Sequence, residues 1–146
     1  MKKWGVPFGL WVLLLFLSAP LASADALARL RVIGASNAGS SIDPSLRDVH
    51  DQLGTLFSFT SYRLLRDQLL DLSLNRPVDI PVHPGRSIEV TLLGERRGVA
   101  EFRVRIKREG TDILNTQVRL SPGRTVLIGG PRHGEGVIIL ALSARF

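Results

Sequence analysis

Histidines and acidic residues are the first candidates for chemistry, because imidazole and carboxylate groups bind metals and transfer protons. The chain has three histidines, His50, His83 and His133, and no cysteine. A zinc site needs three or four converging ligands, whereas these histidines fall in a predicted helix, a turn and a loop. We therefore predict no metal, no cofactor and no catalytic residue.

The segment GGPRHGEG near the C-terminus holds one histidine and one acidic residue, His133 and Glu135. It separates two strongly apolar runs. Glycine supplies the positive φ angles that a chain reversal needs, and Pro131 cannot donate to a strand ladder. We interpret the segment as a hairpin loop and not as a site.

Two other segments contain residue types that occur in the active sites of enzymes. IGASNAGSS lies between a strand and a helix, but Ser40 and Ser41 stand where a phosphate-binding loop needs Lys-Ser/Thr. Asp48 and His50 lie two residues apart on the predicted helix, so they point to different sides, and no G-x-S-x-G elbow is present. A small secreted hydrolase stays open as the alternative function, because triad partners converge in space and not in sequence.

A cationic stripe is the strongest candidate for binding. In GVAEFRVRIKR, the residues Arg103, Arg105 and Lys107 share one side of a predicted strand, and Arg97 and Arg119 lie nearby. Such a stripe could bind an envelope protein or an anionic glycan or lipid surface. No aromatic residues alternate with the arginines, so we predict no nucleic-acid binding. An ordinary solvated sheet face is the alternative.

Residues 1–24 have the three parts of a cleavable signal peptide. Two lysines precede an apolar run, and Ala22-Ser23-Ala24 ends it. We expect cleavage after Ala24 and a periplasmic or secreted protein, residues 25–146, with a net charge of +4. The apolar run is shorter than the roughly 20 residues that a membrane-spanning helix needs, and without cysteine no lipid-modified Cys can follow the signal.

The elements that position these residues are mostly strands. Ala28, Leu30 and Val32 alternate with Arg29 and Arg31, as in a half-buried strand. After Pro77, further segments alternate in the same way between closely spaced turns, which predicts antiparallel neighbours. The run 137–142 is apolar on both faces, so we expect a central strand covered on both sides.

Asp43-Pro44 predicts a helix start. An amphipathic helix is expected from about 44 to 57, with Leu46, Val49, Leu53 and Leu56 on its apolar side. Residues 59–75 fit both a helix and a strand, and we interpret them as two short strands. The predicted fold is a single α+β domain, a β-rich antiparallel sandwich-like sheet of about seven or eight strands with one N-terminal amphipathic helix.

The segment TQVRLSPGRTVLIGGP resembles the strand-turn-strand of the bacterial secretin C-terminal domain. The shared pattern consists of Thr116, Val118, Gly123, Thr125, Val126, Ile128, Gly129 and Gly130. Secretins are oligomeric outer-membrane gates of secretion and pilus systems. The resemblance covers about a tenth of the chain and ends at Pro131, so it implies a similar hairpin and not membership.

Taken together, these features predict a non-enzymatic binding or assembly protein of the bacterial cell envelope. We expect its contact surface to be a sheet edge or the basic face.

Overall fold

The computed structural model describes residues 25–83 and 85–146. They form eight strands, a 3-10 helix and a short α-helix, in the order β1 (Asp25–Ser36), η3 (Pro44–Val49), α1 (His50–Leu56), β2 (Ser61–Ser73), β3 (Val78–His83), β4 (Arg86–Arg96), β5 (Val99–Arg108), β6 (Thr111–Leu120), β7 (Thr125–His133) and β8 (Gly136–Arg145). The predicted signal peptide, residues 1–24, lies outside the described residues. Within the described ranges, no helix has the length and apolar character to cross a membrane.

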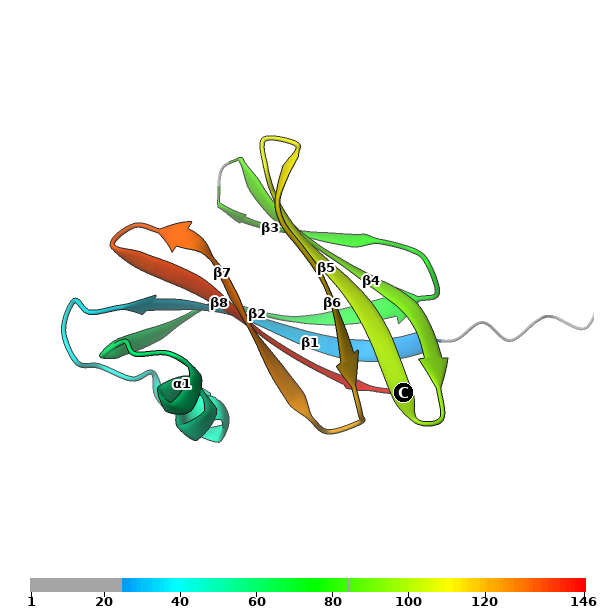
Figure 1. The fold of residues 1–146 in the computed structure, drawn as a ribbon, viewed down its shortest axis with the longest axis horizontal. Helices are drawn as coiled ribbons and strands as arrows, with labels where there is room; N and C mark the ends of the chain where they lie inside the picture. Colours follow the sequence, from blue (N-terminus) through cyan, green and yellow to red (C-terminus); the bar gives the residue numbers. More distant parts are fainter. Residues whose placement is uncertain (1–24, 84) are drawn as a thin grey trace, which may run out of the picture.

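The strands form two four-stranded antiparallel sheets that pack face to face (Figure 1). One sheet has the order β2-β1-β8-β7, and the other is the meander β3-β4-β5-β6. This arrangement confirms the predicted β-rich, sandwich-like α+β fold. The segment that resembles secretins is not a hairpin, however, because its two strands, β6 and β7, belong to different sheets.

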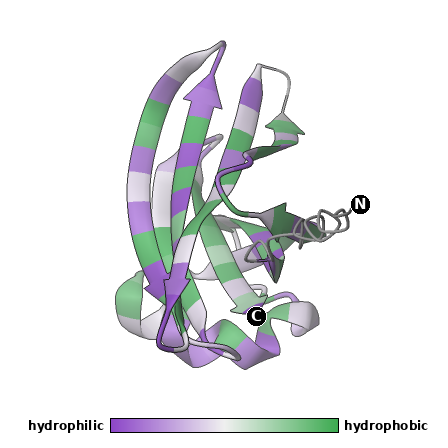
Figure 2. Cartoon of the chain, turned by 90° about the vertical axis from the view of Figure 1, so that its right-hand side faces the viewer, coloured by the Kyte–Doolittle hydropathy of each residue, from purple (hydrophilic) through white to green (hydrophobic). Residues whose placement is uncertain are grey.

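The main core lies between the sheets. Alternate residues of every inner strand are apolar, so each strand turns one apolar side toward the opposite sheet. Figure 2 shows the resulting alternation of hydrophobic and hydrophilic bands along the strands. The largest side chains that are fully buried in this core include Leu30, Leu72, Ile80, Ile88, Leu92, Phe102, Ile106 and Ile138.

A second, smaller core lies on the outer face of the sheet that contains β1 and β8. Leu46 and Val49 of η3 and Leu53 of α1 pack there against apolar residues of the two strands. The strand β8 is therefore covered on one face by the opposite sheet and on the other by the helical segment (Figure 1). This confirms the prediction of a central, doubly covered strand.

The helical segment differs from the prediction in two ways. Its first half is a 3-10 helix that begins after Asp43, whose side chain accepts a hydrogen bond from the Ser45 backbone N–H. Leu56, expected on the apolar side, is exposed instead. It is the last residue of α1, which ends one residue before the predicted end at about 57, and the chain becomes extended at Phe57.

The interpretation of residues 59–75 as two short strands is wrong, because they contain one strand, β2, of 13 residues. Its pairing with β1 shifts at Leu65, where Val32 pairs with Arg66 and Ile33 with Leu64. An extra residue of this kind reverses which face the following side chains occupy. Tyr62 and Leu64 therefore join the helix-side core, and Leu70 and Leu72 join the main core.

Candidate functional site

The predicted cationic stripe lies on the outer face of the meander sheet. Arg103, Arg105 and Lys107 point away from the core on β5, and cross-strand pairing with Glu101 places Arg119 of β6 on the same face. Arg97 lies in the turn between β4 and β5, at the end of the stripe. The five predicted residues thus form one surface, which we call the basic face.

Carboxylates neutralise much of the basic face. The Nζ of Lys107 donates to Glu89 at 2.9 Å, and the Nε of Arg105 lies 3.5 Å from Glu89 and 3.4 Å from Asp112. The hydrogen bond to Glu89 is the main reason that the pKa of Lys107 is raised above its ordinary value. This part of the face is an alternating network of charges and not a purely cationic surface.

The remaining part of the basic face is a shallow groove at the β4–β5 turn. Arg97 and Arg119 line this groove of about 480 Å³ together with Arg96, Glu95 and Glu101. The Nε of Arg119 lies 3.9 Å from Glu101. Three arginines and two glutamates leave only a small excess of positive charge there.

The sheet edges are the second predicted contact surface, and three of the four carry features that block strand addition. The edge strand β3 contains Pro81, and β7 contains Pro131 and an irregular pairing after Gly129. The edge strand β2 has the bulge at Leu65 and several charged residues. Proline, bulges and charge all hinder a further strand from pairing.

The fourth edge strand, β6, lacks this protection over half of its length. Its sequence is TDILNTQVRL, and residues 114–118 include neither proline nor charge. The one irregularity in its pairing with β5 lies before Leu114. Among the described strands, β5 is the only one that pairs with β6, so one row of its backbone N–H and C=O groups faces outward.

The histidine candidates lie on separate elements. His50 is exposed at the start of α1, and His133 is the last residue of β7. Within residues 25–83 and 85–146, no three histidine or acidic side chains are grouped closely enough to hold a metal ion. The expectation of a binding protein, with an enzyme as the open alternative, is not tested by this observation and stays a prediction.

The GGPRHGEG segment is a tighter turn than predicted. The strands β7 and β8 extend to His133 and from Gly136, so only Gly134 and Glu135 form the turn. Gly134 has a φ of 60°, but Gly136 is needed for a different reason. A Cβ atom at Gly136 would lie 1.7 Å from the Ala35 carbonyl oxygen. The turn and close strand packing therefore explain these two glycines.

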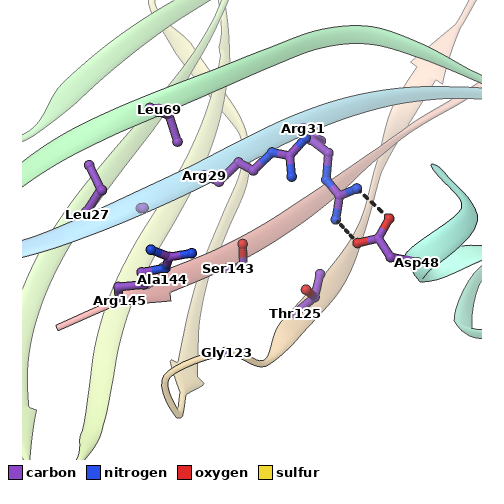
Figure 3. A pocket seen from close by; sticks show the side chains of 11 residues that line it. Leu27, Arg29, Arg31, Asp48, Leu69, Gly123, Thr125, Ser143, Ala144 and Arg145 are labelled. Carbon is purple, nitrogen blue, oxygen red and sulfur yellow. Dashed lines mark hydrogen bonds and ion pairs between the residues drawn. The ribbon is translucent and has the colours of Figure 1, made fainter. Parts of the chain in front are cut away.

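A groove on the outer face of the β2-β1-β8-β7 sheet was not predicted from the sequence (Figure 3). It has a volume of about 390 Å³ and lies beside the helical segment. Arg31 and Asp48 form its inner wall, and both terminal nitrogens of Arg31 donate to Asp48 at 2.8 Å. Arg29, also in the groove, makes a bidentate pair with Asp67.

These ion pairs lower the pKa of both carboxyl groups. Hydrogen bonds from Arg31 hold the pKa of Asp48 below its ordinary value, and hydrogen bonds from Arg29 do the same for Asp67. Both aspartates are therefore charged at neutral pH. The sequence feature that could have indicated this groove is the pair of arginines, Arg29 and Arg31, on the polar side of a strand that is otherwise apolar.

No protein-family model, curated protein or solved structure matches the chain. The resemblance of residues 116–131 to secretins thus remains a prediction, with the difference in strand pairing noted above.

Proposed function

We propose that this protein is an exported, non-enzymatic binding or assembly component of the bacterial cell envelope, and that it contacts its partner through the edge of β6. The observation that carries this proposal is the unprotected stretch from Leu114 to Val118. A partner in extended conformation can add a strand there, with main-chain hydrogen bonds providing affinity and side-chain contacts providing specificity.

The composition of β6 supports strand addition over other contacts. Asn115 and Gln117 are exposed and uncharged, so neither repels an incoming strand. The alternate residues Leu114 and Val118 pack against the main core and hold the strand in place. The edge is therefore both rigid and open, and a preorganised edge of this kind reduces the entropy cost of binding.

The basic face is expected to have only a secondary role in binding the partner. Glu89, Asp112 and Glu101 lie within ion-pair distance of its cationic groups, so little unpaired charge is left to carry affinity. Its residues nevertheless lie on β5, on β6 and in the β4–β5 turn, close to the proposed contact. Charges at the rim of an interface mainly increase the association rate, and we assign that role to Arg97 and Arg103.

Export is supported by the signal-peptide pattern of residues 1–24. The described part of the first strand is Asp25–Ser36, so cleavage after Ala24 would leave every described strand intact. Protein recovered from the envelope is expected to begin at Asp25, as read by N-terminal mass spectrometry. An intact Met1 on that protein would contradict the proposed export route.

The contact is tested by adding charge to the edge. The double variant Asn115→Lys, Gln117→Lys places two lysines on exposed positions of β6, as natural edge strands do. The control, Ala38→Lys, Ser40→Lys, adds the same charge to an exposed loop. Tagged full-length versions are expressed in the native host, and proteins that co-purify from the envelope are quantified.

We expect the partner recovered with the wild type and the control to fall at least tenfold with the edge variant, equivalent to about 1.4 kcal/mol of binding free energy. Equal recovery with all three proteins would rule out the β6 edge as the contact. Thermal unfolding of each purified variant establishes that the edge variant is folded.

A further inference from the structure

The groove beside the helical segment is built by a row of residues that crosses a whole sheet. Leu69 pairs with Arg29, Arg29 with Ser143, and Ser143 with Thr125, so the row runs over β2, β1, β8 and β7. Directly paired residues place their Cβ atoms about 4.5–5.5 Å apart on one face. The next residue pair along the sheet is Leu27 and Arg145.

The three arginines that line this groove differ in whether a carboxylate pairs with them. Asp67 is engaged by Arg29 and Asp48 by Arg31, each through two hydrogen bonds. Among the described residues, no carboxylate lies within ion-pair distance of Arg145. Its exposed guanidinium can therefore bind an added anion.

A second observation points to a missing hydrogen-bond acceptor. The Arg31 side chain is buried, and its Nε has no hydrogen-bond partner within the described part of the chain. Buried donors in proteins are nearly always paired with a protein group, a ligand or an ordered water. The wall of the groove therefore contains a buried donor without a partner among the described residues, in addition to the exposed guanidinium of Arg145.

The part of the groove over β1 and β2 has an apolar lining. Leu27 and Leu69 are 45% and 65% exposed, and both line the groove (Figure 3). They lie diagonally across the β1–β2 pair, since Leu27 pairs with Asp71 and Arg29 with Leu69. Ser143 and Thr125, at the polar end, have hydroxyl groups that can donate to an anion.

We propose that this groove binds a small anionic amphiphile, meaning a phosphate or carboxylate group attached to a short alkyl chain. The Arg145 guanidinium and the Ser143 hydroxyl bind the anionic group, because guanidinium matches the geometry of phosphate and carboxylate oxygens. Leu27 and Leu69 contact the alkyl chain. The volume of about 390 Å³ lies within the range of small-molecule sites.

This site lies on the opposite sheet from β6, so the result of its test is independent of the proposed partner contact. The test uses protein purified after expression of the full chain, with octyl phosphate as the probe in isothermal titration calorimetry. Inorganic phosphate, octanol and octanoate are titrated in parallel. Arg145→Gln and Leu69→Ser are the groove variants, and Arg108→Gln, at an exposed position of β5 on the other sheet, is the control.

We expect octyl phosphate to bind the wild type and Arg108→Gln with the same affinity, within about twofold. Its affinity should fall at least tenfold in each groove variant, and inorganic phosphate and octanol should bind at least tenfold more weakly than octyl phosphate. Octanoate separates the two head groups: binding equal to that of octyl phosphate indicates a general oxyanion site, and weaker binding indicates a phosphate site.

Three results would overturn the proposal. They are the absence of binding by both octyl phosphate and octanoate, unchanged affinity in Arg145→Gln, and octanol binding as tightly as octyl phosphate. The replaced side chains, Arg145 and Leu69, are both exposed, so the variants are expected to fold. Their thermal unfolding is measured to establish this.

Discussion

Arg31 of β1 and Asp48 of η3 form a bidentate ion pair between the sheet and the helical segment, with both nitrogen–oxygen distances at 2.8 Å. The Arg31 side chain is 3% exposed, whereas that of Asp48 is 57% exposed. One carboxylate at the surface therefore neutralises a buried guanidinium. The two parallel hydrogen bonds also fix how the helical segment lies on the sheet.

Asp48→Ala should destabilise the protein, because it leaves the buried Arg31 without its counter-charge. Breaking a fully buried pair costs about 3–5 kcal/mol. Since Asp48 is more than half exposed and solvent screens the pair, we expect about 1–3 kcal/mol. The measurement is urea unfolding. Asp71→Ala, at an exposed position of β2, is the control and should change stability by about 0.5 kcal/mol or less.

The same ion pairs predict the acid sensitivity of the fold. The pKa values of Asp48 and Asp67 are lowered by hydrogen bonds from Arg31 and Arg29. A carboxyl group whose pKa is lower in the folded state contributes stability above its unfolded pKa, about 3.9, and loses that contribution as the pH falls through the folded value. Unfolding free energy should therefore decrease below about pH 4.

The Asp48→Asn variant tests the origin of this decrease. It should be less stable than the wild type at pH 7, and its stability should fall less steeply between about pH 4 and pH 2. Urea melts of both proteins at several pH values give the two slopes. Parallel slopes would show that Asp48 does not contribute to the acid sensitivity.

Leu140→Ala tests the central position of β8. Leu140 is fully buried in the main core, so its truncation should cost about 2–5 kcal/mol in urea unfolding. Arg103→Ala, on the outer face of β5, should cost about 0.5 kcal/mol or less. A Leu140→Ala protein as stable as the wild type would contradict the packing of β8 between two layers.

Gly136→Ala tests the close approach of β8 to β1. The added Cβ would overlap the Ala35 carbonyl oxygen, so the backbone of one strand must move. Overpacking usually costs about 1–3 kcal/mol, and we expect a loss at or above the top of that range. Gly94→Ala is the control, because no atom lies within 4 Å of its added Cβ. Equal unfolding free energies for the two variants would contradict the close approach of β8 to β1.

The alternating segments after Pro77 predicted their strands correctly because the apolar residues of each keep to one side, so one period runs along the segment. Residues 59–75 failed for a definite reason. The bulge at Leu65 switches the buried side within one strand, and a change of phase looks like two elements or a helix. A strand whose buried side changes partway along cannot be assigned from a single period.

Most of the basic face was predictable because four of its five residues are close in sequence, on β5 and in the turn before it, and Arg119 lies on the next strand. Its neutralising carboxylates were not, since Glu89 and Asp112 come from adjacent strands. The groove was missed for the same reason: the row from Leu69 to Thr125 exists only once four strands are ordered. Arg31 looked solvated because the sequence does not show that η3 covers it.

The central claim is that β6 is the contact edge, and hydrogen–deuterium exchange tests it most directly. Exchange is measured on the protein alone and bound to the partner isolated from the envelope. A strand added to β6 should protect outward-facing amides between Thr111 and Leu120, and the edge strands β2, β3 and β7 should exchange as before. Protection confined to another edge or to the groove, with β6 unchanged, would contradict the account.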